Sequence, residues 1–152
     1  MMKQRLDATF NRANVVGPDL KLQADFARYL CVLVSGYIEK AVVAFVLEHA
    51  RQKGGPTLQR FVELRTKRFT NAKASRVQQL LGSFDPNWQQ ELEEFLVEER
   101  KVAVDSIVSL RNVIAHGGSV GLTYSRIREY YEHAQRVVDR VGDLCVPGAD
   151  GA

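Results

Sequence analysis

Apolar residues recur along most of this chain at every third or fourth position, which is the repeat of an α-helix that buries one side. The clearest case begins near Leu22 and continues to about Gln52, where Gly54-Gly55-Pro56 predicts the end of the helix. At 1.5 Å per residue, thirty residues of helix would be about 45 Å long, enough to cross a small domain. The pattern therefore predicts one long helix against which shorter helices can pack.

Five further helices are predicted from the same repeat and from residues that favour helix ends. They cover about 3–14, 58–69, 72–81, 86–115 and 123–144. Asp85-Pro86 favours a helix start because aspartate caps the first turn and proline fits its first position. The other expected caps are Thr57, Thr70 or Asn71, and Thr123, with Gly82 as a helix end. No pair of strands is predicted, so we expect an all-α bundle with two long antiparallel helices plus shorter ones.

The composition is that of an ordinary globular protein, with 152 residues, 45% of them hydrophobic and 26% charged. This length can bury a core, and we expect a single domain over residues 1–146 with a flexible tail over 147–152. The net charge of +3 permits an anionic partner without requiring one. Cys31 and Cys145 fit a reduced intracellular protein better than a disulfide framework or a zinc site.

No segment predicts export or insertion into a membrane. The N-terminus, with Lys3 and Arg5, lacks the apolar core of a signal peptide. The most apolar stretch, residues 29–47, is interrupted by Glu39 and Lys40, and we expect it to be too short and too polar to span a bilayer comfortably. A cytoplasmic protein without membrane contact is therefore expected.

The segment Arg111-Asn112-Val113-Ile114-Ala115-His116-Gly117-Gly118 brings three kinds of chemistry to one helix end. Arginine offers a permanent fork of donors for phosphate, histidine carries protons near neutrality, and asparagine is a neutral hydrogen-bonding group. On an unbroken helix, Arg111 and His116 would point about 140° apart. Because the two glycines predict that the helix ends there, both side chains can still face one opening.

A purely structural role for this segment is an open alternative. Arg111 could pair with a core carboxylate such as Glu39, Asn112 could satisfy backbone groups, and His116 could cap the helix. No grouping of His, Cys, Asp or Glu has the spacing of a metal site, so we expect no metal and no other cofactor.

The helix that carries the segment has two apolar stripes about 100° apart. They are Ala103, Ile107, Leu110 and Ile114, and Val104, Val108, Arg111 and Ala115. A helix covered on two sides in so small a chain suggests that a second subunit covers the extra face. A two-fold homodimer would bring two copies of Arg111 and His116 to one seam.

These residues resemble the HEPN family, small α-helical domains whose motif is arginine followed, after four to six residues, by histidine. The likeness is sharpest at 110–117, where the polar residue after arginine and the final Ala-His-Gly are similar to the RiboL-PSP-HEPN and MAE-28990-like branches. Gly36-Tyr37-Ile38-Glu39 and Asn71-Ala72-Lys73 support it, and it extends over about 19–145. The resemblance implies a bundle that dimerises with both motifs facing a common cleft.

The resemblance also implies metal-independent endoribonuclease activity, often in toxins or defence effectors. By position, Arg111, Asn112 and His116 would be the catalytic residues, and Glu39 would support them by orienting Arg111. RNA would be the substrate because its 2′-hydroxyl takes part in the reaction. An antitoxin or another protein partner is a further expectation. Because some members have lost activity, the alternatives are an inactive module that dimerises or binds a nucleotide or protein, and a purely structural helical scaffold.

A basic stretch between residues 60 and 76 could extend an RNA site. The candidates are Arg65, Lys67, Arg68 and Lys73, joined by Tyr124 just after the motif. The favoured interpretation of the stretch is a solvated helix face, because Glu63 interrupts it and the net charge is small. The acidic run between Glu91 and Glu99 is expected to be a second solvated face.

Overall fold

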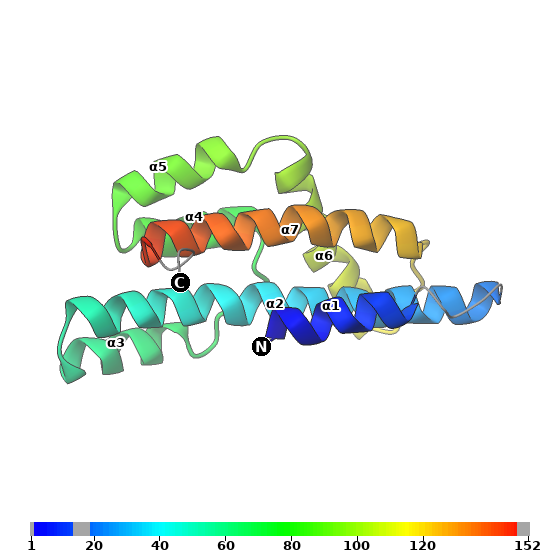
Figure 1. The fold of residues 1–152 in the computed structure, drawn as a ribbon, viewed down its shortest axis with the longest axis horizontal. Helices are drawn as coiled ribbons and strands as arrows, with labels where there is room; N and C mark the ends of the chain where they lie inside the picture. The colour runs from blue at the N-terminus through cyan, green and yellow to red at the C-terminus, as the bar shows by residue number, and fades with distance from the viewer. Residues whose placement is uncertain (1, 14–18, 149–152) are drawn as a thin grey trace.

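The computed structural model describes residues 2–13 and 19–148, and these form seven helices and no strands (Figure 1). The helices are α1 (Met2–Ala13), α2 (Leu20–Lys53), α3 (Pro56–Thr66), α4 (Ala74–Gly82), α5 (Pro86–Phe95), α6 (Glu99–Ala115) and α7 (Tyr124–Cys145). The predicted all-α bundle is confirmed. Most of the expected tail, residues 149–152, lies outside the described residues.

The bundle is built on α2 and α7, which lie side by side along the long axis of the molecule (Figure 1). The two helices run parallel to each other. Tyr37 packs its ring against Tyr131, and further along, Nδ1 of His49 lies 3.0 Å from the carbonyl oxygen of Cys145. Two helices joined by a short turn would be antiparallel, but four helices separate α2 from α7 and return the chain to the end where α2 begins.

The single helix predicted over 86–115 is broken into α5 and α6. Leu96 ends α5 with φ −83° and ψ 64°, and Glu98 precedes α6 with a positive φ of 51°. Neither glycine nor proline marks this break. An unbroken helix would extend about 45 Å and leave much of its apolar surface in water. The break instead lets α5 fold back onto α4 and α7, where Leu92 and Leu96 are buried.

Two helix starts also differ from the prediction, and at the second a group from another helix supplies the cap. Helix α3 begins at Pro56, with Gly55 rather than Thr57 at the capping position. Helix α4 begins at Ala74, and its first free amide, on Ala74, donates to Oδ1 of Asp105 on α6 over 2.8 Å. The caps expected from Asp85 and Thr123 are confirmed by their bonds to the amides of Asn87 and Arg126.

By length and composition alone, part of α2 is long and apolar enough to cross a membrane, which corrects the expectation that it is too short and too polar. The core helix of a bundle passes the same test. In this fold α2 contacts α1, α3, α6 and α7, and its apolar residues supply much of the shared core.

The two cysteines lie in this core as free thiols. Cys31 on α2 is fully buried, and its Sγ lies 3.6 Å from the carbonyl oxygen of Ile107, so it joins α2 to α6. Burial disfavours the thiolate and raises the pKa of Cys31 to about 11 and that of Cys145 to about 12. Both side chains are therefore small core residues without the electropositive surroundings that make a thiol reactive.

Candidate functional site at the end of helix α6

The segment from Arg111 to Gly118 stands at the carboxyl end of α6, and its two glycines end that helix as predicted. The amide of Gly118 donates to the carbonyl of Val113 over 2.8 Å, and the amide of Gly117 donates to that of Ile114 over 3.0 Å. These are the paired bonds of a Schellman turn, which requires a left-handed residue after the helix. Gly117 supplies that residue with φ +78°. At Gly118 a Cβ atom would lie 2.5 Å from Cγ1 of Val113.

The three motif side chains differ in how the chain holds them. Arg111 and Asn112 are half-buried, and Nη1 of Arg111 donates to Oδ1 of Asn112 over 3.4 Å. His116 is exposed, and no hydrogen bond or ion pair with another described residue holds its imidazole. Neither the guanidinium nor the imidazole is sealed inside the protomer. The arginine is thus partly restrained beside an amide, while the histidine is free to meet a second molecule.

The first half of each apolar stripe of α6 is buried within a single chain, whereas Leu110 and Ile114 are half-buried and Ala115 is exposed. Ala103 and Ile107 from one stripe are fully buried, as are Val104 and Val108 from the other. They pack in the angle between α2 and α7, which both contact α6. The position of α6 inside the bundle therefore accounts for both stripes over residues 103–108, and the second subunit inferred from them is not needed there.

A different face of α6 carries apolar side chains into solvent. Val102 is 56% exposed and Val113 is 41% exposed, and Ser109 between them is exposed as well. With 100° of turn per residue, these positions and His116 fall within a band about 60° wide. Sequence reasoning missed this face, although the spacing of eleven residues between the two valines is the signal that could have found it.

Glu39, the expected support for Arg111, makes its contact elsewhere. Its Oε1 accepts from the amide of Asn71 over 3.1 Å, and Asn71 has a left-handed φ of 53°. No hydrogen bond or ion pair joins Glu39 to Arg111 within the described part of the chain. The structure thus brings Glu39 to the loop before α4 rather than to the motif, and the structural pairing of Arg111 with Glu39 is not made either.

The candidate RNA contacts come from three different parts of the fold. Arg65, Lys67 and Arg68 are exposed at the end of α3, which lies beside the last part of α2 in Figure 1. Lys73 is exposed and directly precedes Ala74, whose amide is capped by Asp105 of α6. The hydroxyl of Tyr124 donates to the carbonyl of Phe10 over 3.0 Å and accepts from Arg128 over 3.1 Å, which ties it to α1.

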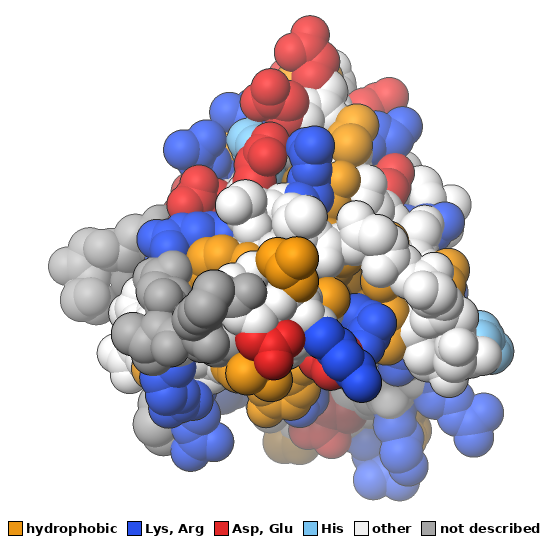
Figure 2. Space-filling view, turned by 90° about the vertical axis from the view of Figure 1, so that its right-hand side faces the viewer, with side chains coloured by type: hydrophobic (Ala, Val, Ile, Leu, Met, Phe, Trp, Pro, Cys, Tyr) orange, Lys and Arg blue, Asp and Glu red, His pale blue; other side chains and the backbone are white. Residues whose placement is uncertain are grey.

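Charge is unevenly spread over the end of the molecule from which α2 and α7 start. In Figure 2, Lys and Arg side chains project along the lower edge, on the side where α1 lies in Figure 1, and many Asp and Glu side chains gather toward the top, where α5 lies. The acidic residues of α5, Glu91, Glu93 and Glu94, are exposed, as expected for a solvated face. Within the described residues, no group of three or more His, Cys, Asp or Glu side chains is arranged to hold a metal ion.

Comparison with protein families identifies the family of this chain. The family model described as RiboL-PSP-HEPN matches residues 3–146, which include nearly all of the seven helices and the whole motif. The chain belongs to the RiboL-PSP-HEPN family. No curated protein and no solved structure matches the chain. Family membership makes the arginine–histidine segment of α6 the first candidate for the functional site of this HEPN domain.

Proposed function

We propose that this HEPN domain is a metal-independent endoribonuclease whose active residues are Arg111, Asn112 and His116. The observation that carries the proposal is the position of the family's motif at the open end of α6, with a half-buried guanidinium and an exposed imidazole. Phosphate recognition needs a restrained cation, because a planar fork binds two phosphate oxygens only when its orientation is held. Proton transfer needs an imidazole that can reach the substrate.

The reaction follows from these groups. His116 would take the proton of the ribose 2′-hydroxyl as the 2′-oxygen attacks the neighbouring phosphorus. The new oxygen–phosphorus bond forms while the bond to the 5′-oxygen breaks, and that oxygen leaves with a proton from a second acid. Arg111 would stabilise the negative charge that develops on the phosphorane, and Asn112 would position Arg111 through the hydrogen bond between their side chains. The products are a 2′,3′-cyclic phosphate and a 5′-hydroxyl.

We propose His116 of a second copy as that acid, which makes the working enzyme a homodimer. The exposed face of α6 supports this arrangement, because Val102 and Val113 would be covered by the same face of the partner. A two-fold interface is self-complementary and brings equivalent residues toward its axis. The two imidazoles would then lie at one seam and divide the roles of base and acid between them. A toxin or defence role, restrained by an antitoxin or another protein, is the biological setting that we propose for the activity.

The test of the chemistry is cleavage of a labelled single-stranded RNA in excess EDTA. We expect the wild type to cleave it and to leave cyclic phosphate ends. His116→Ala should lose at least about 100-fold in rate, since general acid–base catalysis contributes about 10²–10⁴-fold. Lys101→Ala, an exposed cation removed from the same helix, should keep wild-type activity. Cleavage by His116→Ala at the wild-type rate would overturn the assignment.

The test of the proposed dimer interface is Val102→Glu, which places a charge on that interface without changing the motif. We expect a folded monomer with little cleavage, measured by sedimentation velocity, circular dichroism and the RNA assay. Lys101→Gln also lowers the net charge by one unit, at a neighbouring exposed position, and should keep both the dimer and the activity. An active monomer of Val102→Glu would show that one chain suffices.

An inactive HEPN module for dimerisation or binding is the second candidate. The observation that favours it is the lack of any group within the described chain that orients the imidazole of His116. This candidate predicts an intact dimer that cleaves none of a panel of structured and unstructured RNAs, whether or not EDTA is present.

A further inference from the structure

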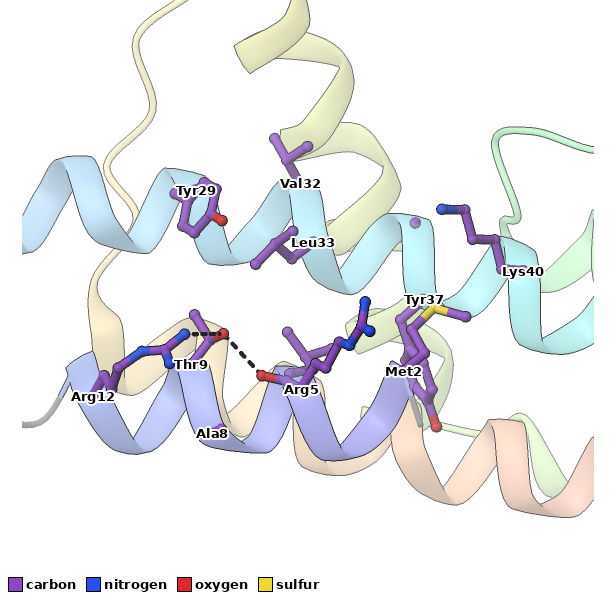
Figure 3. A pocket seen from close by; sticks show the side chains of 12 residues that line it. Met2, Arg5, Ala8, Thr9, Arg12, Tyr29, Val32, Leu33, Tyr37 and Lys40 are labelled. Atoms are coloured by element: carbon purple, nitrogen blue, oxygen red, sulfur yellow. Dashed lines mark hydrogen bonds between the residues drawn. The ribbon is translucent and has the colours of Figure 1, made fainter.

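A groove with a volume of about 580 Å³ runs between α1 and α2, outside the motif (Figure 3). The two helices are antiparallel here, since Met2 lies beside Tyr37 at one end and Arg12 lies near Tyr29 at the other. Its apolar lining includes Tyr29, which is 55% exposed, and Val32, which is 40% exposed. Large apolar side chains in such positions commonly mark a surface that another molecule covers.

The groove contains a glycine in the middle of the longest helix. Gly36 lines the groove on α2, and glycine inside a helix is less favourable than alanine because its backbone loses more freedom on folding. A Cβ atom at Gly36 would meet nothing within 4 Å. Gly142 on α7 is different, since a Cβ atom there would lie 2.7 Å from the ring of Phe45. Packing explains Gly142, whereas no packing within the described chain explains Gly36.

The rims of the groove are basic. Arg5 and Arg12 line it from α1 and Lys40 lines it from α2, and none of the lining residues is acidic. Arg12 donates to Oγ1 of Thr9 over 3.1 Å, while the side chains of Arg5 and Lys40 form no hydrogen bond or ion pair with the residues that the structure describes. In Figure 3 the guanidinium of Arg5 reaches into the space between the two helices. An anionic occupant would offset the desolvation of these cations.

We propose that the groove between α1 and α2 binds an acidic amphipathic helix of another protein. From Tyr29 to Lys40 the groove follows twelve residues of α2, a rise of about 17 Å, which matches three turns of a docked helix. The docked helix would place apolar residues at every third or fourth position on the floor and carboxylates against the rims. At Gly36 the missing side chain lets the two backbones approach closely. This inference goes beyond the proposed nuclease and does not depend on it.

A second copy of this chain fits the groove less well. Grooves of two copies placed face to face would bring the cations at Arg5, Arg12 and Lys40 together, and like charges repel. The acidic helix of the chain itself, α5, has the right charge. Its apolar residue Leu92 is fully buried within the bundle, and so it cannot fill another chain's groove without unfolding.

The test uses a fluorescein-labelled helical peptide of fifteen residues. It carries leucines at every third or fourth position on one face, glutamates beside them and alanines elsewhere; a matched peptide carries lysines in place of the glutamates. By fluorescence anisotropy we expect the full-length protein to bind the glutamate peptide at least tenfold more tightly than the lysine peptide. Gly36→Leu should weaken binding at least tenfold. Ala44→Leu, which adds the same side chain at an exposed position further along α2, should not.

Each other outcome counts against the proposal. Equal binding by wild type and Gly36→Leu would place the peptide elsewhere. If the wild type binds a labelled RNA oligonucleotide but neither peptide, and Gly36→Leu loses this RNA binding, the groove is a nucleic-acid site. A change of oligomeric state in Gly36→Leu would assign the groove to a second copy. Gly36→Ala controls for folding and should melt no lower than wild type. RNA cleavage measured without peptide should be the same in Gly36→Leu and wild type, so that failure of one proposal leaves the other intact.

Discussion

The left-handed residue that ends α6 gives the most direct test of how the motif is held. Gly117 has φ +78° immediately after His116. In Gly117→Ala, a Cβ atom would be introduced where it meets nothing within 4 Å, so no clash with the rest of the protein is expected. The whole effect should come from the backbone, because an L-residue in the left-handed region brings its Cβ too close to its own carbonyl oxygen.

The expected magnitude is the difference between two terms. The left-handed conformation costs an alanine about 1–2 kcal/mol. The loss of freedom in the unfolded chain offsets about 0.4–1 kcal/mol of that. The free energy of unfolding should therefore fall by about 1 kcal/mol, which lowers the Tm of a domain of this size by about 2–4 °C. Hydrogen exchange of the Gly117 and Gly118 amides should also speed up, since both donate to carbonyls of α6.

Thermal unfolding followed by circular dichroism, with urea titration for the free energy, measures this change. Gly121→Ala is the matched control, since Gly121 lies in the same loop, its φ is not in the left-handed region and a Cβ atom there meets nothing within 4 Å. Gly117→Asn should recover part of the loss, because asparagine tolerates the left-handed region better than alanine. If Gly117→Ala and Gly121→Ala melt at the same temperature, the account of this helix end is wrong.

Four further outcomes are expected. Asp105→Ala should lower the free energy of unfolding by about 1–2 kcal/mol and speed exchange of the Ala74 amide, whereas Asp105→Asn should do less because it keeps an acceptor. Leu92→Ala should lower the free energy of unfolding by about 2–5 kcal/mol if α5 docks through this buried side chain, whereas Glu93→Ala, at an exposed position, should change it little. Cys31 and Cys145 should react with a thiol reagent at pH 8 only when the protein is unfolded. The free energy of unfolding should fall as the pH rises above 9, because the unfolded thiols ionise near their ordinary pKa of 9.0 while burial holds the pKa of folded Cys31 at about 11. A urea midpoint that is unchanged between about pH 8 and 10.5 would contradict this.

Local sequence was sufficient for features that depend on a few neighbouring residues. The helical repeat predicted α2 and α7 closely, since the pattern of buried positions extends over many turns. Asp85 and Thr123 were assigned as caps because a side chain there reaches an amide two or three residues ahead. Gly117-Gly118 was assigned as a helix end for the same reason: the bonds that close the turn involve only residues 113–118.

Distant contacts decided what the sequence left open. The start of α4 depends on Asp105, thirty-one positions away from the amide it caps. The break between α5 and α6 carries no glycine or proline and exists because α5 gains contacts with α4 and α7. The parallel direction of α2 and α7 depends on the path of the four helices between them. Both stripes of α6 looked alike along their length in the sequence, and only the packing revealed that residues 103–108 are buried within one chain.

For the candidate site the same division holds. The identity of Arg111, Asn112 and His116, their place at a helix end and the resemblance to HEPN domains were all present in the linear sequence, because the motif spans fewer than two helical turns. Tertiary structure alone decided three other features. Glu39 does not pair with Arg111, one face of α6 meets solvent, and Gly36 opens into a groove beside α1. Spacing along one helix sets the direction of a side chain, but its neighbours come from segments that the chain brings back from far away.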